Sequence, residues 1–256
     1  GQVRRNRHRW RRNRHRPDGA VDLRQRLIQA DVMARLEHLL PSSCRPAHPA
    51  ALDLGDAETR LSVIANAKDV CAICEARGGW LDLYFIDNDA RNFDRGNLLP
   101  ACPLCRAGQG LHRSHAAIEF LPVWVPEIPQ IAINRLTRIL HLRLLDAGET
   151  PVIDQRHRPS LDDQTTRDLV SAYLALANRS VRLGIVLGGY SPNARDLATL
   201  FYAADPGRGA CPQKLSAGLR LLPLGRYMVD GKDRYAEALG RPPPNAATPV
   251  NAQEAA

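Results

Sequence analysis

The chain has 256 residues, a formal net charge of +8, 44% hydrophobic residues and 24% charged residues. These values are typical of a soluble globular protein of one or two domains, and they exclude a wholly disordered chain. No run of about 18 uncharged apolar residues occurs, so we do not expect an integral membrane protein. The arginine-rich start likewise does not resemble a secretory signal.

The positive charge is concentrated at the start of the chain. Residues 1–16 contain eight arginines and no acidic residue, as two copies of Arg-Arg-Asn-Arg-His-Arg on either side of Trp10. The other 27 basic residues balance the 27 acidic ones. Because like charges repel one another, we expect a disordered arm over 1–17. Its arginines suit nucleic acid, an anionic surface or an acidic partner. Alternatively, the arm has no function or is a start-site artefact.

Four features are predicted in the first half after the arm. An amphipathic pattern predicts a helix over 18–40, and a shorter helix is predicted over 57–68. Residues 81–86 alternate and are rich in aromatic and aliphatic side chains, which predicts a strand. Prolines at 122, 126 and 129 then predict a break in regular structure.

The second half has a mainly helical pattern. The segment 130–146 carries apolar residues on one face and leaves Arg135, Arg138 and Arg143 outside it, and Gly148 ends the helix. A helix over 162–178 is predicted to start with Thr165 or Thr166 as its N-cap.

Further helices are predicted towards the C-terminus. Ser191-Pro192 predicts a helix start, with the helix running to about residue 203. Short helices are predicted over 213–222 and 231–239. The tail 241–256 is rich in proline and alanine, so we expect it to be disordered.

Four of the six cysteines form two Cys-x-x-Cys pairs, Cys71 with Cys74 and Cys102 with Cys105, separated by 27 residues. Two such pairs suit one tetrahedral Zn²⁺ with Zn–S bonds near 2.3 Å. An iron–sulfur cluster and a redox dithiol remain alternatives. Four thiolates would close the zinc to substrate, which predicts a structural ion whose binding energy stabilises the fold. Cys44 and Cys211 are interpreted as small buried hydrophobic residues.

The segment between and around these pairs resembles the zinc-bracketed ββα-metal core of HNH nucleases. The predicted strand 81–86 follows the first pair, Asp87-Asn88 occupies the place of the nuclease Asp-His, and Asn97-Leu98 precedes the second pair. The resemblance implies that the second residue of Asp-His is the general base. Here that residue is Asn88, whose amide cannot accept a proton near neutral pH.

A second departure concerns the catalytic metal. Arg106 stands directly after Cys105, where the nuclease commonly has a metal-binding histidine. Losing both base and ligand predicts that hydrolysis is abolished, so we expect no catalytic residues. His112 and His115 could restore a metal site with Asp87 or Asp89; the alternative is a solvated loop.

Four features in order make the resemblance narrower, over roughly residues 57–240. They are the two cysteine pairs with Asn97-Leu98, Ile-Glu-Phe-Leu-Pro at 118–122 before a long helix, Val-Arg-Leu-Gly at 181–184 through Gly-Tyr-Ser-Pro at 189–192, and Leu-Arg-Leu-Leu-Pro at 219–223. Together they are similar to the IcmJ/DotN component of the Dot/Icm (type IVB) secretion apparatus and its conjugation relatives. The resemblance implies a non-enzymatic subunit with an HNH-like fold that keeps the structural zinc at Cys71, Cys74, Cys102 and Cys105.

The resemblance also implies partners and a location. The subunit would bind the C-terminal extension of the type IV coupling ATPase (DotL-like) and other coupling-complex subunits. It would be cytoplasmic and peripheral to the inner membrane. Two alternatives stay open: an HNH-type metal-dependent DNA endonuclease, and a DNA-binding zinc protein that uses the arm.

The expected fold class is α+β, with a small HNH or treble-clef-like zinc-bound ββα centre before a mainly helical C-terminal half. The predicted organisation is an arm (1–17), an N-terminal helix and linker (18–56), a zinc-binding domain (57–121), a helical region (122–240) and a tail (241–256).

Overall fold

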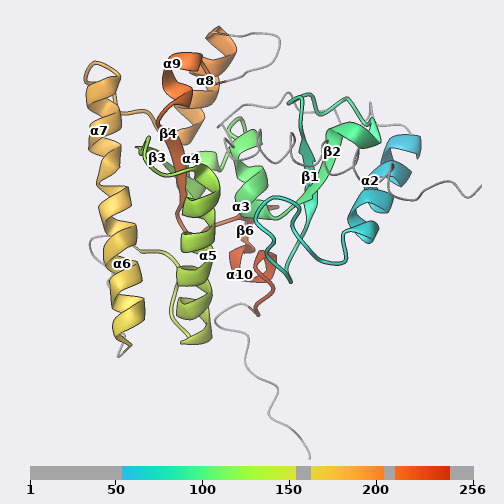
Figure 1. Cartoon of the computed structure of the whole chain (residues 1–256), viewed down its shortest axis with the longest axis horizontal. Coiled ribbons are helices and arrows are strands. Elements are labelled where there is room, and N and C mark those ends of the chain that lie inside the picture. Colours follow the sequence, from blue (N-terminus) through green and yellow to red (C-terminus); the bar gives the residue numbers. More distant parts are fainter. Residues whose placement is uncertain (1–53, 154–162, 205–210, 243–256) are drawn as a thin grey trace, which may run out of the picture. The chain divides into compact units, whose positions relative to one another are not determined.

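The computed structural model of the chain describes residues 54–153, 163–204 and 211–242 (Figure 1). These residues belong to one compact unit, which covers 36–256. The predicted arm, the helix over 18–40, Cys44 and nearly all of the tail lie outside the described residues. The predicted domain boundaries stay predictions.

The described part mixes helices with small antiparallel strand pairs, as the α+β prediction requires. It begins with helix α2 (Leu54–Asn66), close to the helix predicted over 57–68. Strand β1 (Asp82–Phe85) lies inside the predicted strand 81–86. The sequence pattern missed its partner β2 (Leu98–Ala101), which follows the short 3-10 helix η2 (Arg95–Asn97).

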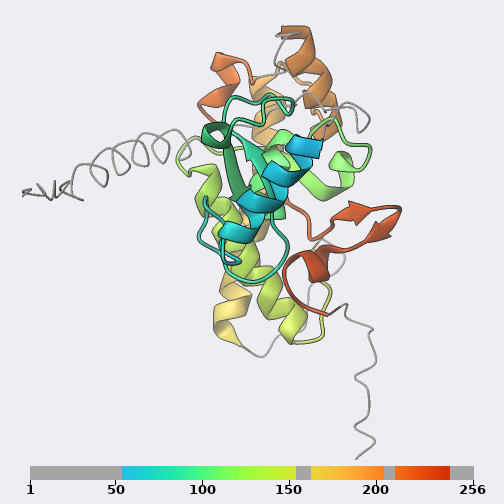
Figure 2. The same cartoon turned by 90° about the vertical axis from the view of Figure 1, so that its right-hand side faces the viewer.

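The β1–β2 pair supports the cysteine-containing segment. It is antiparallel, with Asp82 opposite Ala101 and Phe85 opposite Leu98. Helix α2 packs across it, which Figure 2 shows in blue over the green strands. Leu83, Phe85 and Leu98 form a small core there. Helix α3 (Pro103–Arg106) and the 3-10 helix η3 (Ala107–Gln109) follow β2 directly.

A second strand pair joins distant parts of the chain. After helix α4 (Ala116–Glu119), strand β3 (Phe120–Trp124) pairs with β4 (Leu219–Pro223) in antiparallel register, from Phe120 opposite Pro223 to Trp124 opposite Leu219. The helix predicted over 213–222 is therefore wrong beyond its first turn, α9 (Gln213–Ser216). All five residues of β4 are buried, and a continuous apolar run does not distinguish a strand from a helix.

The β3–β4 pair separates two apolar cores. Alternate side chains point to opposite faces of a strand, so Leu219 and Leu221 join one core and Leu222 the other. The first core also contains residues of α4, α7 (Arg179–Val186) and α8 (Ala194–Ala204). The second contains residues of α5 (Gln130–Asp146) and α6 (Gln164–Ala177).

Helix α5 has the predicted bounds, but its faces differ from the prediction. Arg138, predicted to lie outside the apolar face, is buried. The reason is that α5 is covered on two sides, by α6 and by α3 (Figure 1). The helix therefore lies between the cysteine-containing segment and the helices at its other side.

Two predicted helix starts are corrected by the hydrogen bonds. Asp163, and neither Thr165 nor Thr166, is the N-cap of α6, because its carboxylate accepts from both threonine N–H groups at 3.2 and 3.0 Å. Helix α8 is capped by Asn193 rather than at Ser191-Pro192. The Asn193 side chain accepts from the N–H groups of the second and third residues of α8 at 2.9 and 3.0 Å.

The C-terminal segment forms a small hairpin and a short helix. Strands β5 (Met228–Val229) and β6 (Lys232–Asp233) pair, and α10 (Tyr235–Ala238) follows. The prediction of a helix over 231–239 is thus correct only for its second part. Helix α7 was not predicted at all.

One helical stretch, 164–186, is long and apolar enough by length and composition to cross a membrane; it comprises α6 and α7. Of the apolar window in this stretch 28% is buried, and Val170, Tyr173 and Leu183 are among the residues of the stretch that pack against the rest of the protein. The expectation that this is not an integral membrane protein stays a prediction.

Candidate metal centre

The first cysteine pair lies in a tight turn between α2 and β1. The Cys71 N–H donates to Ala76 O at 3.0 Å, and the Glu75 N–H donates to Cys71 O at 2.9 Å. Glu75 adopts the left-handed conformation, with φ of 62°. These bonds turn the chain back on itself, so that Cys71 and Cys74 lie on the same side of the turn.

The second pair is positioned by the start of α3. Cys102 immediately precedes the helix, Pro103 takes the first helical position, and Cys105 lies two residues further on. Proline suits that position because it has no N–H to satisfy and its φ is already helical. The Cys105 N–H donates to Cys102 O at 3.0 Å. The first turn of the helix therefore places both sulfurs on one side.

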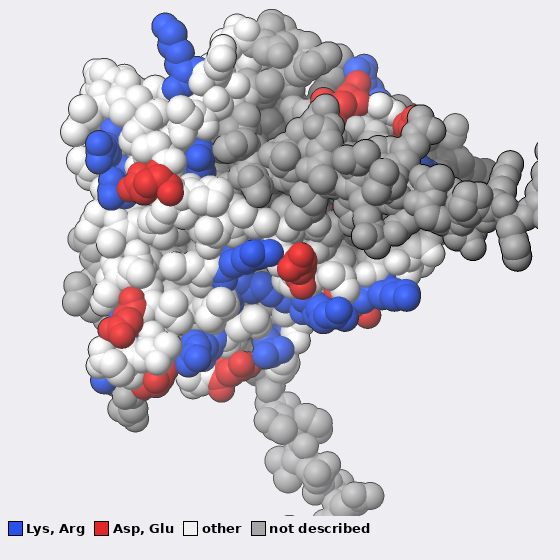
Figure 3. Space-filling view, in the orientation of Figure 1, with Lys and Arg blue, Asp and Glu red and all other residues white. Residues whose placement is uncertain are grey.

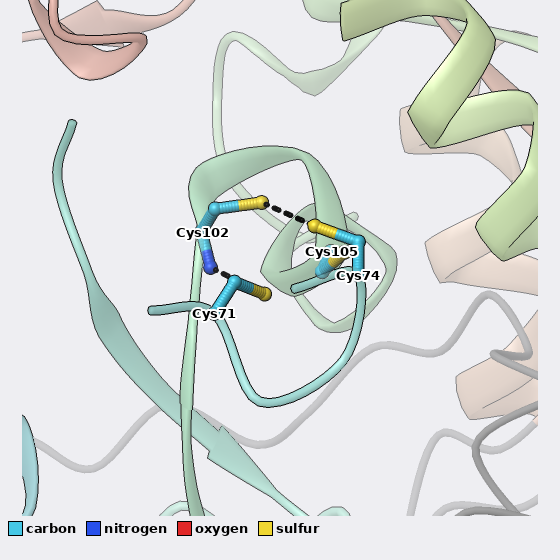
Figure 4. Close-up of side chains that lie close together, drawn as sticks. All are labelled: Cys71, Cys74, Cys102 and Cys105. Carbon is cyan, nitrogen blue, oxygen red and sulfur yellow. Dashed lines mark hydrogen bonds between the residues drawn. The ribbon is translucent and has the colours of Figure 1, made fainter. Parts of the chain in front are cut away.

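Two hydrogen bonds donated by backbone N–H groups bring the pairs together. The Ala72 N–H donates to Pro100 O at 2.8 Å, and the Cys102 N–H donates to Cys71 Sγ at 3.3 Å. The four Sγ atoms all lie within 4.8 Å of one another, and those of Cys74 and Cys102 are 3.6 Å apart (Figure 4). All four side chains are buried. The structure thus gathers every cysteine that the spacing singled out.

These distances fit a single tetrahedral ion. Metal–sulfur bonds of about 2.3 Å at tetrahedral angles put neighbouring sulfurs about 3.8 Å apart. A cluster of several iron atoms would hold the thiolates further apart than 4.8 Å, because iron and sulfide would lie between them. The four cysteines can therefore bind one metal ion, and a multi-iron cluster does not fit this arrangement.

Electrostatics also favour a cation at this place. The contact with Cys102 lowers the pKa of Cys71 and raises that of Cys105, where burial adds to the increase. Four negative sulfurs cannot be buried together without a compensating positive charge. A bound dication supplies that charge, and its binding releases the remaining thiol protons.

Two helices from the second half of the chain hold the first cysteine turn. Arg135 Nε of α5 donates to Cys74 O at 3.2 Å, and Arg138 donates to Arg77 O and Gly78 O at 3.1 and 3.0 Å. Gly79 lies against α10, where a Cβ would come within 2.5 Å of Ala238 O. The amphipathic pattern of 130–146 does not predict these contacts, because it places the arginines on the solvent-facing side of the helix.

The positions that the HNH resemblance assigns to catalytic residues make contacts within the protein. Asn88 has a φ of 63°, and its Oδ1 accepts from Gln109 Nε2 at 3.3 Å. The Asp87 carboxylate accepts from the side-chain amides of Asn92 and Asn97 at 2.6 and 2.8 Å. These acceptors are used to shape the loop 87–97.

The residue after Cys105 also has a role in packing. Arg106 Nε donates to Leu83 O at 3.0 Å and lies 3.1 Å from an Asp82 carboxylate oxygen. One turn later, Gln109 bonds both the N–H and the C=O of Phe85, at 3.0 and 2.5 Å. The side chains that contact β1 from α3 and η3 are therefore a cation and an amide, and both are bonded to the backbone of that strand.

His112 and His115 do not form a second metal site. Within the described ranges, only the four cysteines form a group of three or more metal-binding side chains close enough to share an ion. Burial lowers the pKa of His112, whose Nδ1 has no hydrogen-bond partner. Cys211 is half-buried, and burial raises the pKa of its thiol to about 12. It packs beside an apolar core, but it is only partly buried, so the prediction of a buried hydrophobic residue holds in part.

No known protein-family model matches the chain, and comparison with curated proteins finds no match.

Proposed function

We propose that this protein is a non-catalytic, zinc-stabilised adaptor of a type IVB secretion or conjugation coupling complex. In this proposal it binds the C-terminal extension of the coupling ATPase and works in the cytoplasm, peripheral to the inner membrane. The zinc-bound segment corresponds to a degenerate HNH, treble-clef-like ββα centre. The family assignment rests on the sequence features at 71–105, 118–122, 181–192 and 219–223.

The observation that carries the proposal is the closed cysteine site. Four buried thiolates would fill the tetrahedral coordination sphere of one ion and would leave no open position for water or substrate. Zn²⁺ prefers this ligand set and geometry. The ion would therefore stabilise the fold of the segment 71–109, which has only a small apolar core of its own.

The contacts of Asn88 and Arg106 support a non-catalytic role. Asn88 stands in the place of the general base, and its amide oxygen is bonded to Gln109. Arg106 brings a positive charge to the place where a nuclease would bind a divalent metal. Both features argue against the HNH endonuclease alternative.

The DNA-binding alternative depends on the arginine-rich arm. Figure 3 shows Lys and Arg interspersed with Asp and Glu on one face of the described part, with uncharged areas between them. A wide phosphate-binding surface would need an excess of positive charge. The arm is thus the element that favours nucleic acid, and deleting residues 1–16 should abolish any DNA binding and its salt dependence.

Metal analysis and two functional assays test the proposal on the full chain. We expect one zinc per chain by plasma mass spectrometry, no nicking of supercoiled plasmid with Mg²⁺ or Mn²⁺, and capture of the coupling-ATPase extension in a pull-down. Metal-dependent nicking that Asp87→Ala abolishes would overturn the non-catalytic assignment. Failure to bind the extension would overturn the adaptor assignment.

A further inference from the structure

A buried amide on α5 contacts the candidate metal centre directly. Asn134 is 2% exposed, and its Nδ2 lies 3.2 Å from Leu104 O and 3.6 Å from Cys105 Sγ. The two N–H groups of one amide thus account for both contacts. One of them is donated to the sulfur of a candidate metal ligand.

The neighbouring glutamine fixes which way this amide points. Gln130 accepts from the Leu221 N–H through Oε1 at 2.8 Å and donates to Leu221 O through Nε2 at 2.7 Å. Its Nε2 also donates to Asn134 Oδ1 at 2.9 Å. Because Leu221 holds Gln130 at both ends, Asn134 must present its oxygen to Gln130. Its nitrogen must therefore face Cys105.

The direction of the bond matters chemically. A thiol sulfur is a weak acceptor, whereas a thiolate carries negative charge and accepts N–H groups well. An N–H directed at Cys105 therefore stabilises the deprotonated, metal-binding form. Hydrogen bonds from neighbouring groups orient metal ligands, and their loss typically weakens metal binding 10- to 100-fold.

We propose that Asn134 positions and stabilises Cys105 as a metal ligand and, through Gln130, links the metal centre to strand β4. This inference rests on the metal site of the proposed function. Buried hydrogen bonds connect Cys105 to Asn134, Asn134 to Gln130 and Gln130 to Leu221. This chain of bonds leads from the cysteine centre into the middle of the β3–β4 pair. Metal loading then fixes the packing of α5 against β4 as well as the two cysteine turns.

The first test is Asn134→Asp, which keeps the side-chain shape and replaces the N–H donor with a negative oxygen beside the sulfur. We expect about 10- to 100-fold weaker zinc binding in chelator competition. We also expect a shift in the sulfur-to-metal charge-transfer band of the Co²⁺-loaded protein. The matched control is Thr137→Val, a buried position one turn along α5, which should bind zinc like the wild type.

The band position separates a positioning role from a general loss of stability, because it reports on the bound sulfurs alone. Unchanged affinity and an unchanged band in Asn134→Asp would overturn the proposal. The same loss of affinity in Thr137→Val would also overturn it.

A second measurement uses the unmodified protein and does not depend on a variant that folds. Hydrogen exchange is compared between the zinc-loaded and the chelator-treated full chain. We expect amides of α5 and β4 to lose more protection than those of α8, which shares a core with Leu221 but has no part in this series of hydrogen bonds. Equal changes in β4 and α8 would overturn the link to β4. A wild-type protein that binds no metal would instead overturn the zinc assignment itself.

Discussion

The cysteine centre and the β3–β4 region are stabilised in different ways. Among the described residues, three apolar side chains are buried together around β1 and β2, whereas eleven and nine form the two cores on either side of β3–β4. Burial of a large aliphatic or aromatic side chain contributes about 1.5–3 kcal/mol. The segment 71–109 therefore depends on a bound ion and on hydrogen bonds, and the rest of the described part depends on apolar packing.

The largest expected effect is the loss of the metal. Cys102→Ala removes one of four ligands, and structural zinc sites bind with about 10–16 kcal/mol that stabilises the folded state. We expect the β1–β2 amides to lose protection in hydrogen exchange while those of α6 and α8 keep theirs. The control is Cys211→Ser, which should retain one zinc per chain. Preserved protection of β1–β2 in Cys102→Ala would contradict the comparison.

A substitution in an apolar core should lower the stability of the fold and leave the metal content unchanged. Phe201 is fully buried in α8, so Phe201→Ala should lower the free energy of unfolding by about 3–5 kcal/mol in urea denaturation. The zinc content of the folded protein should stay at one. Leu200→Ala changes the adjacent, exposed position and should cost less than about 1 kcal/mol. Loss of zinc from folded Phe201→Ala would show that the cysteine centre and the β3–β4 region are not stabilised independently.

Acid should weaken the helical region through His141. Its Nδ1 lies 2.7 Å from Tyr235 OH, and burial lowers its pKa to about 3 from an ordinary value of 6.5. The unfolded chain takes up the proton first, so this contribution is complete above pH 6.5 and is lost as the pH falls towards 3. Between pH 7.5 and 5 we expect a loss of about 2 kcal/mol.

The variant His141→Gln isolates this effect, because glutamine can still bond Tyr235 OH but does not titrate. Protonation of the cysteine ligands affects both proteins equally. Denaturation at several pH values should therefore give a shallower pH dependence for the variant between pH 6.5 and 5. Parallel curves would assign the whole acid effect to other groups.

The smallest expected effect concerns the start of α8. Asn193→Ala removes the side chain that caps the helix and should cost about 1 kcal/mol. Asn193→Asp keeps an acceptor there and should restore the stability in thermal denaturation. An effect of Asn193→Ala on zinc affinity would contradict the conclusion that the cysteine centre and the β3–β4 region are stabilised in different ways.

The sequence predicted correctly those features whose pattern lies within a short stretch of the chain. The cysteine pairs were found because their spacing alone describes the ligand set, and 130–146 because its apolar residues repeat at helical intervals. Strand β4 was missed because five consecutive buried residues have no period, and its partner β3 lies about a hundred residues away along the chain.

The contacts around the cysteine centre were missed for a different reason. Gln130, Asn134 and Arg138 are polar residues on buried faces of α5, and amphipathic patterns assign polar residues to solvent. Their partners are mostly backbone carbonyls in other segments, which no local pattern reveals. A polar residue repeated at i and i+4, as at 130 and 134, was the one available signal.

The pairing of β3 with β4 has a consequence for how the protein is made. All four cysteines leave the ribosome roughly a hundred residues before β4, and at about 5–20 residues per second that interval is about 5–20 s. The nascent chain can bind its ion during this time, while β3 still has no partner. During synthesis the metal centre can therefore form before the two cores, because both cores need residues 219–223.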